Sequence, residues 1–254
     1  MLNEMFNLAG KVALITGGSK GLGKAMARGL VEAGADVLIS SRHEIELKSA
    51  LAEILQGTKR RGEYFVADMA RRSEAGKLAS FALEKLGKVD ILINNAGTNV
   101  PQAVDAITDA EWDRIMEINL NSVMALTRAI VPQMKPRKWG RVIHISSVMA
   151  FVSNDGRNIY SATKAALVAM ARASALDLGP FGITVNCIAP GPFLTDLPAS
   201  VLSKEEQDRF AKMTALNRWA DPKELVGTAL LLASQAGSYI TGSTFIVDGG
   251  FTAR

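Results

Sequence analysis

The feature that most constrains the fold is an alternation of short apolar, β-branched runs with longer segments of helical periodicity. Seven runs are strand candidates, at residues 11–16, 36–41, 63–67, 89–94, 140–146, 183–189 and 243–247. Strands that alternate with helices in this way form βαβ units around a parallel sheet. Residues 12–15 and 91–93 are apolar at every position, as central strands covered on both faces require. The pattern predicts an α/β fold: a doubly wound parallel sheet of about seven strands with helices on both faces.

The segments between these runs predict helices at residues 22–33, 44–56, 73–86, 110–134, 160–178 and 222–232. Residues 197–217 break the alternation, because Ser203 and Glu206 have the spacing of a capping box and start a helix without a strand before it. An extra helix there predicts a substrate lid around residues 192–217, over the carboxyl ends of the strands. Since no repeat or low-complexity linker divides the chain, we expect residues 1–254 to form a single domain.

Composition and charge exclude several classes of protein. The 29 basic residues exceed the 25 acidic ones only slightly and lie in scattered clusters, so we expect no nucleic-acid partner. No stretch approaches about 18 consecutive apolar residues and the N-terminus lacks a signal-peptide pattern, so we expect no membrane segment. The one cysteine, Cys187, favours a reducing, cytoplasmic location. The two histidines, His43 and His144, lack metal-ligand spacing, so we expect no metal site.

The first strand candidate runs directly into a glycine-rich turn, and a helix follows. The run is Thr16-Gly17-Gly18-Ser19-Lys20-Gly21-Leu22-Gly23. Glycines at such a turn let a pyrophosphate approach the backbone closely, on the free N–H groups of a helix N-terminus. A Walker-type loop would need a hydroxyl residue after Lys24, and Ala25 stands there. The turn predicts a Rossmann-type dinucleotide site rather than a site for phosphoryl transfer; glycine turns that bind nothing are the alternative.

A second candidate site stands at the start of the fifth predicted helix. Tyr160 and Lys164 are four residues apart, so both side chains project from one face. A free tyrosine titrates near pH 10, and a neighbouring ammonium group would stabilise its phenolate. Tyr160 could then exchange a proton with a carbonyl or alcohol oxygen while a hydride moves at the carbon. Ser146 and Ser147 end the preceding strand, and either hydroxyl could hydrogen-bond the same oxygen.

The glycine spacing T-G-x-x-x-G-x-G, the Tyr-x-x-x-Lys pair and the motifs between and after them resemble the short-chain dehydrogenase/reductase family over nearly the whole chain. The 3-oxoacyl-carrier-protein reductase and gluconate 5-dehydrogenase branches look closest. The resemblance implies four catalytic residues, Asn119, Ser147, Tyr160 and Lys164. It favours Ser147 over Ser146, because the offset of thirteen residues between Ser147 and Tyr160 matches the family. The family's asparagine holds a water that passes protons to the lysine; a helix-kink residue is the alternative for Asn119.

The resemblance also implies a set of cofactor-binding residues. In the family the run after the fourth strand, here Asn94-Asn95-Ala96-Gly97, lines the adenosine side of the cofactor. The run after the sixth strand, here Pro190 to Thr195, holds the nicotinamide amide, and the residue at the end of the third strand, here Asp68, contacts adenine. Phe193 departs from the β-branched aliphatic residue usual there, which leaves the backbone contact intact. The expected set is Gly17, Ser19, Lys20, Gly21, Leu22, Gly23, Ser41, Arg42, Asp68, Met69, Asn95, Ala96, Gly97, Tyr160, Lys164, Pro190, Gly191, Phe193 and Thr195.

The end of the second strand predicts which nicotinamide cofactor is used. An acidic residue there would bind the ribose 2′-hydroxyl of NAD, whereas a basic residue would pair with the 2′-phosphate of NADP. Ser41 stands where NAD-preferring relatives carry aspartate, Arg42 follows it, and Lys20 adds a second cation. Because arginine suits bidentate binding of phosphate, we predict NADP(H), with these three residues around the 2′-phosphate. Two exposed cations and a polar loop residue are the alternative.

Together these features predict an enzyme that transfers a hydride between NADP(H) and a carbonyl or secondary alcohol. The expected substrate is a keto-sugar acid such as 5-ketogluconate or a 3-oxoacyl thioester, contacted by Ser147, Met149, Arg157 and Tyr160. An exposed loop arginine is the alternative for Arg157. The alternative is a catalytically silent cofactor-sensing protein of the same fold, which a broken set of catalytic residues would mark. From the family we expect a homotetramer, or a homodimer, assembled through the helices at residues 110–134 and 160–178.

Overall fold

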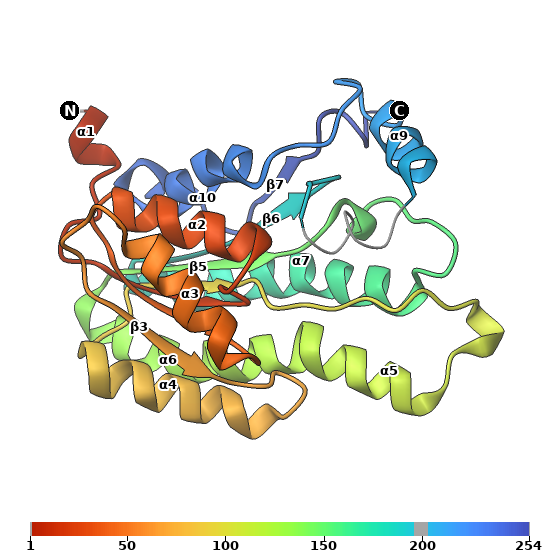
Figure 1. Cartoon of the computed structure of the whole chain (residues 1–254). Coiled ribbons are helices and arrows are strands. Elements are labelled where there is room, and N and C mark those ends of the chain that lie inside the picture. Colours follow the sequence, from red (N-terminus) through yellow and green to blue (C-terminus); the bar gives the residue numbers. More distant parts are fainter. Residues whose placement is uncertain (1, 196–202, 254) are drawn as a thin grey trace.

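The computed structural model of the chain describes residues 2–195 and 203–253, and a seven-stranded parallel sheet lies at its centre (Figure 1). The strands are β1 (Val12–Thr16), β2 (Asp36–Ser41), β3 (Gly62–Val66), β4 (Ile91–Asn94), β5 (Gly140–Ile145), β6 (Ile183–Pro190) and β7 (Thr244–Val247). They lie in the order β3-β2-β1-β4-β5-β6-β7, and every neighbouring pair is parallel. The predicted doubly wound sheet is confirmed, with β1 and β4 in its centre.

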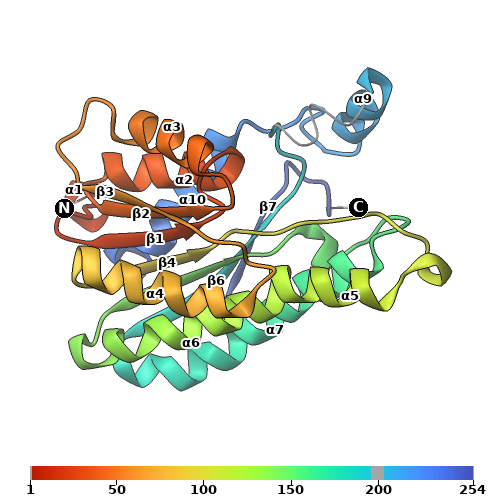
Figure 2. The ribbon, with the colours of Figure 1, turned by 60° about the horizontal axis from the view of Figure 1, so that its bottom comes forward.

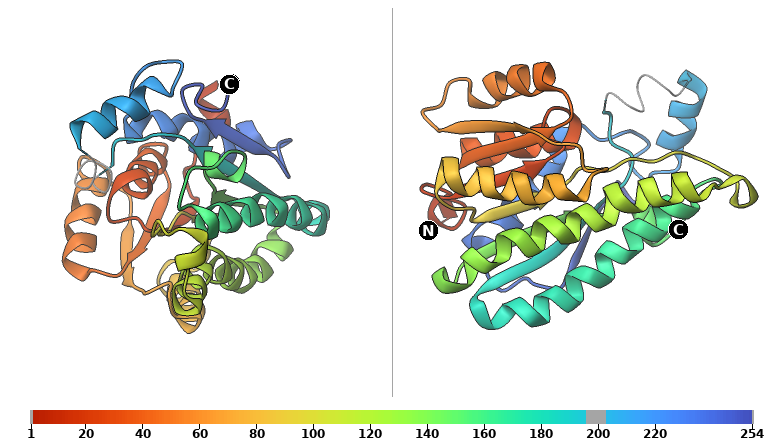
Figure 3. Two further views of the ribbon diagram at one scale, coloured as in Figure 1. Left: turned by 90° about the vertical axis from the view of Figure 1, so that its right-hand side faces the viewer. Right: turned by 90° about the horizontal axis from the view of Figure 1, so that it is seen from below.

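Helices cover both faces of this sheet (Figure 2). They are α1 (Leu2–Met5), α2 (Gly21–Glu32), α3 (Glu44–Leu55), α4 (Arg72–Leu86), α5 (Asp109–Met116), α6 (Ser122–Met134), α7 (Asn158–Leu178), α9 (Lys204–Lys212) and α10 (Val226–Ala233). In Figure 2, α2, α3 and α10 lie above the sheet and α4, α6 and α7 lie below it. Figure 3 shows the lower helices side by side in its right-hand view. None of the described helices is both long and apolar enough to cross a bilayer.

Each face of the sheet has its own hydrophobic core, because alternate side chains of a buried strand point to opposite faces. Leu14 and Leu92 point into the core between the sheet and helices α4, α6 and α7. Ile15 and Ile93 point into the core between the sheet and helices α2, α3 and α10. All four side chains are 0% exposed. Burying an aliphatic side chain of this size contributes roughly 1.5–3 kcal/mol, so these runs have to be central strands.

The long helix predicted at residues 110–134 is interrupted. A π-helical turn, Glu117–Asn121, separates α5 from α6. The helix predicted at 222–232 begins instead with a 3₁₀ turn, Pro222–Leu225, before α10. Strand β3 lies one residue earlier than predicted, since pairing with β2 sets its limits. A π-helical turn in a helix is often functional.

The extra helix after β6 is present. Helix α9 begins after Ser203, which accepts a hydrogen bond from the Glu206 N–H, while the Glu206 carboxylate accepts one from the Ser203 N–H. The predicted capping box is therefore confirmed. Residues 196–202 of the predicted lid lie outside the described residues, and both the lid and the single domain stay predictions.

The order of the strands decides where a ligand site can lie. The chain moves outward from β1 to β3, returns to β4 beside β1, and moves outward again to β7. A crevice opens outside the carboxyl ends of parallel strands at such a reversal. The loops that follow β1, β2, β4, β5 and β6 all leave the sheet at this end, and they carry most of the residues singled out in the sequence.

Candidate active site

The turn between β1 and α2 is built for close approach of a ligand. Lys20 precedes α2 in extended conformation, and no side chain of residues 2–195 and 203–253 caps this helix end, which leaves its first N–H groups to an anion. Gly17 and Gly21 have positive φ angles of 64° and 55°. A Cβ atom at Gly23 would lie 2.2 Å from the Gly17 carbonyl oxygen. This turn therefore requires glycine at these positions for steric reasons.

Asn95, just beyond β4, fixes the loop after β4 against this turn. Its Nδ2 donates to the carbonyl oxygens of Thr16 (2.9 Å) and Gly17 (3.1 Å), and its N–H donates to the Thr16 hydroxyl (3.0 Å). Both amide hydrogens of Asn95 are thus used within the protein. The amide of Asn95 therefore holds the two loops together.

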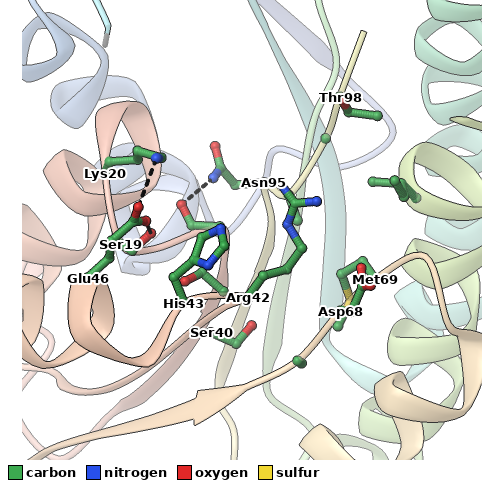
Figure 4. A pocket seen from close by; sticks show the side chains of 16 residues that line it. Ser19, Lys20, Ser40, Arg42, His43, Glu46, Asp68, Met69, Asn95 and Thr98 are labelled. Carbon is green, nitrogen blue, oxygen red and sulfur yellow. Dashed lines mark hydrogen bonds and ion pairs between the residues drawn. The ribbon is translucent and has the colours of Figure 1, made fainter. Parts of the chain in front are cut away.

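A cavity of about 250 Å³, here called the glycine-turn cavity, opens between β1, β2 and β4 (Figure 4). Ten of the expected cofactor residues line it: Gly17, Ser19, Lys20, Ser41, Arg42, Asp68, Met69, Asn95, Ala96 and Gly97. Segments that are far apart in the sequence meet here because the carboxyl ends of their strands meet.

Two groups in this cavity lack partners among the described residues. The Ser41 hydroxyl is buried without a hydrogen bond. Arg42, which Figure 4 shows reaching across the cavity, makes no hydrogen bond or ion pair with the residues described at 2–195 and 203–253. Lys20 differs, since its ammonium group lies 3.3 Å from a Glu46 carboxylate oxygen. A buried hydroxyl without a partner beside an unpaired guanidinium group is suited to a polar, anionic ligand group.

A second cavity, of about 620 Å³, is here called the tyrosine cavity. It shares Lys20, Arg42, Asn95, Gly97 and Thr98 with the glycine-turn cavity, so the two adjoin. Further expected residues line it: Gly21, Leu22, Ser147, Tyr160, Lys164, Pro190, Gly191, Phe193 and Thr195. Gly23, Asn119, Met149 and Arg157 are not among the lining residues of either cavity.

Tyr160 lies in the first turn of α7, partly buried in the wall of the tyrosine cavity. Burial raises the pKa of its phenol, while a hydrogen bond with Ser147 and the charge of Arg157 lower that pKa. The net shift is upward, so the phenol is protonated at neutral pH and can donate a proton. The charge of Arg157 thus acts on Tyr160, and its expected contact with substrate stays a prediction.

Lys164 lies one helical turn after Tyr160 and is 4% exposed. Its Nζ donates to the Ile145 carbonyl oxygen at 2.8 Å and lies 5.5 Å from the centre of the Tyr160 ring. Desolvation by burial lowers the pKa of Lys164 to about 8. An ammonium group has three hydrogens, so two remain for a ligand in the cavity. Near neutral pH this lysine is a cation close to the phenol.

The two serines that follow β5 have different environments. The Ser146 hydroxyl donates to the Lys164 carbonyl oxygen at 2.7 Å and so fixes α7 against the strand. The Ser147 hydroxyl accepts from the Met149 N–H at 3.1 Å and lines the tyrosine cavity together with Tyr160. That bond does not use the Ser147 hydroxyl hydrogen, which can be donated to a ligand. This geometry agrees with the expectation that Ser147, rather than Ser146, meets the reacting oxygen.

Asn119 lies in the π-helical turn and is 0% exposed. Its Oδ1 accepts from the Thr98 N–H at 2.8 Å, and its Nδ2 donates to the Thr98 carbonyl (2.9 Å) and the Thr163 hydroxyl (3.1 Å). A Cβ atom at Gly97 would lie 3.4 Å from both Asn119 Oδ1 and Lys164 Nζ. Both Nδ2 hydrogens of Asn119 are used, so the side-chain nitrogen has none left for a water. The water-holding role stays a prediction, and the side chain itself positions the loop at Thr98.

His144 lies on β5 beneath the site and is 0% exposed. Asn94 Nδ2 donates to Thr127 Oγ1 at 3.2 Å, because the Thr127 hydroxyl hydrogen already goes to the Val123 carbonyl. The other contact of Asn94 Nδ2, 3.1 Å to His144 Nδ1, therefore makes Nδ1 an acceptor and places the proton on Nε2. Burial and the charge of Lys164 lower the pKa of His144 to about 4. The histidine is neutral at physiological pH.

Several cavity residues were missed by the sequence reasoning. Trp219 lines the tyrosine cavity, because an isolated bridge between Phe193 and Ala220 brings its loop alongside the segment after β6. The Trp219 Nε1–H donates to the Gln207 carbonyl of α9. Glu46 lines the glycine-turn cavity from the first turn of α3. No sequence motif marks either residue.

Among the described residues, no group of three histidine, cysteine or acidic side chains could hold a metal ion.

Known proteins resemble this chain along its whole length. A protein-family model described as enoyl-(acyl carrier protein) reductase matches residues 17–252. An uncharacterized oxidoreductase from Mycobacterium tuberculosis is 41% identical over 254 residues, which cover 99% of this chain and 96% of that protein. A gluconate 5-dehydrogenase from Gluconobacter oxydans is 34% identical over 251 residues, with coverage of 98% and 97%. The crystal structure of a gluconate 5-dehydrogenase from Burkholderia cenocepacia, in complex with NADP and tartrate, superposes with a TM-score of 0.93 at 33% identity and full coverage of both chains.

Proposed function

Since the chain belongs to the short-chain dehydrogenase/reductase family, we propose that it is an NADP(H)-dependent oxidoreductase acting on a carbonyl or secondary alcohol. The observation that carries this proposal is that two cavities adjoin and share five lining residues. The protonated phenol of Tyr160, with Ser147 and Lys164, lines one of them, and the glycine turn with Arg42 lines the other. Proton transfer and hydride transfer need such a shared space.

The residues present fit a phosphorylated dinucleotide. The turn at Gly17 and Gly23 leaves no room for a Cβ, and the free N–H groups of α2 suit a pyrophosphate. The unpaired Arg42 and the Ser41 hydroxyl suit a 2′-phosphate. Pro190 to Thr195 would hold the nicotinamide end, in the tyrosine cavity. The Burkholderia relative that binds NADP supports the same choice.

When bound, the nicotinamide supplies or accepts the hydride. In reduction, Tyr160 donates its proton to the substrate carbonyl oxygen, and Ser147 hydrogen-bonds with that oxygen. The cation of Lys164 and the charge of Arg157 stabilise the phenolate that results, and Lys164 can bind a cofactor hydroxyl with its two free hydrogens. In oxidation, Tyr160 takes the proton back from the alcohol. Asn119 keeps the loop at Thr98 in place throughout.

For the substrate we propose a keto-sugar acid such as 5-ketogluconate, with a 3-oxoacyl thioester as the alternative. The Asn99 Oδ1 is buried in the wall of the tyrosine cavity with no hydrogen-bond partner among the described residues. An amide without a partner there favours a substrate that carries hydroxyl groups. The family model's description supports the acyl alternative, and the Gluconobacter relative supports the sugar acid. Oxidation of NADPH with each substrate class compares them directly.

The exchange Tyr160→Phe tests the enzyme assignment. Loss of the phenol hydroxyl removes the proton donor, so turnover should fall at least about a thousandfold while the dissociation constant of NADPH changes little. Tyr239→Phe is a matched control, because Tyr239 is fully exposed and lines neither cavity. Wild-type turnover in Tyr160→Phe would overturn the assignment. NADPH binding by a wild-type protein with no activity on any carbonyl or alcohol would favour the silent cofactor-sensing alternative.

We further propose a homotetramer, or a homodimer, in a reducing cytoplasm. Exposed apolar side chains on α5, α6 and α7 support an interface, among them Trp112, Met124 and Leu176. The single cysteine is buried and free, which suits a reducing compartment. Light scattering measures the assembly, and a mass equal to one subunit would contradict it.

A further inference from the structure

The glycine-turn cavity contains a carboxylate among its cations. Glu46 projects from the first turn of α3, and its two oxygens accept from the Ser19 hydroxyl and the Lys20 ammonium group, both at 3.3 Å. Figure 4 shows this contact on one side of the cavity and Arg42 reaching across from β2. Of the two cations expected at a 2′-phosphate, one is therefore already paired with an acid of the protein.

This pairing has an electrostatic consequence for the ligand. A 2′-phosphate carries about two negative charges, and it would compete with Glu46 for Lys20. The carboxylate would also repel the phosphate, and the Glu46 side chain is only 40% exposed, so water screens this repulsion incompletely. An unphosphorylated ribose would meet neither penalty, because its hydroxyl can donate to a carboxylate.

We propose that Glu46 is a residue that sets cofactor specificity: it neutralises Lys20 and thereby reduces the preference for NADP(H) over NAD(H). The inference rests on the proposed NADP(H) site and deepens it. Arg42 and Ser41 provide the attraction for the 2′-phosphate, and Glu46 limits the contribution of Lys20. The wild-type protein then prefers NADPH but still binds NADH.

The exchange Glu46→Gln tests this role. The amide keeps the size of the side chain and removes its charge, so NADPH should bind about threefold to tenfold more tightly. NADH affinity should stay the same or fall, so the ratio of the NADH dissociation constant to the NADPH dissociation constant rises. Glu53→Gln is the matched control, because Glu53 lies on the same helix, pairs with Lys24 at 2.5 Å and lines neither cavity. That variant changes the net charge equally and should leave the ratio unchanged.

A double-mutant cycle with Lys20→Met tests the mechanism. If Glu46 neutralises Lys20, removing Lys20 costs less NADPH affinity in the wild type than in Glu46→Gln. If Lys20→Met costs the same NADPH affinity in the wild type and in Glu46→Gln, the proposal is overturned. It is also overturned if Glu46→Gln lowers the ratio of the NADH to the NADPH dissociation constant or leaves it unchanged. Thermal unfolding of each variant confirms that it is folded. A wild-type protein that binds NADH more tightly than NADPH would instead refute the proposed cofactor, whatever Glu46→Gln does.

Discussion

Replacing Asn119 by alanine removes the side chain that joins three segments of the active site. Asn119 makes three hydrogen bonds, two partly buried ones with the backbone of Thr98 and a buried one with Thr163 on α7. Each such bond contributes roughly 0.5–1.5 kcal/mol net, and water can reach the partly buried Thr98 in the variant. We therefore expect Asn119→Ala to lower the free energy of unfolding by about 2–4 kcal/mol, measured by urea denaturation.

The same exchange should reduce catalysis. Thr98 lines both cavities, and Gly97 before it lies close to the Lys164 ammonium group. A loop displaced by about 1 Å can cost about a hundredfold in rate, so we expect kcat to fall by about tenfold to a hundredfold. The Thr98 amide hydrogen should also exchange with solvent faster, because its acceptor is gone.

Ser122→Ala is the matched control for Asn119→Ala. Ser122 is equally buried beside the π-helical turn, and its hydroxyl donates to the Ile118 carbonyl without touching Thr98. It should cost about 1 kcal/mol of stability and leave kcat unchanged. If Asn119→Ala behaves like Ser122→Ala in stability, kcat and exchange at Thr98, the positioning role given to Asn119 is wrong.

Three further predictions concern charge and steric fit. In the direction of reduction, kcat/KM should fall as the pH rises through about 8, because Lys164 loses its proton there. Lys164→Arg should move this fall in kcat/KM to higher pH. If the fall stays at the same pH in that variant, a group other than Lys164 causes it. His144 has a folded pKa of about 4, below its ordinary 6.5, so its neutral form stabilises the protein above pH 6.5 and this contribution, about 3 kcal/mol, is lost as the pH falls toward 4. Urea denaturation at pH 6.5 and 4.5 should show a smaller loss for His144→Gln than for the wild type. Gly23→Ala should weaken NADPH binding more than about tenfold, because its Cβ would meet the Gly17 carbonyl oxygen at 2.2 Å; Gly76→Ala, whose Cβ meets nothing within 4 Å, should bind normally in the same titration.

Much of the architecture could be predicted because it rests on local patterns. A run that is apolar on both faces can be stable only between two layers of helices, so β1 and β4 were recognisable from residues 12–15 and 91–93 alone. The capping box of α9 and the glycine turn also depend on neighbours within a few residues. Such signals are contained in a short window of sequence.

The site could be predicted in part. Ser147, Tyr160 and Lys164 were chosen by spacing, and the fold brings them to one cavity because β5 and α7 are consecutive elements. Arg157 lines neither cavity and its charge acts on Tyr160, so its expected contact with substrate stays a prediction. Met149 likewise lies outside both sets of lining residues. Spacing along the chain indicates which side chains lie on the same face of a helix or strand. It does not indicate which residues of other elements they contact.

The sequence by itself determined the layered α/β fold, the glycine-rich turn and the Tyr160–Lys164 pair, since local periodicity and glycine stereochemistry specify them. Only the tertiary structure decided the partners of Asn119, which are 21 and 44 residues away, and the contact between Ser19 and Glu46, which are 27 residues apart. These contacts depend on how strands and helices pack against one another. The sequence pattern does not show which surfaces of these elements come into contact. For that reason the interruption at residues 117–121 and the carboxylate in the glycine-turn cavity became visible only in the folded chain.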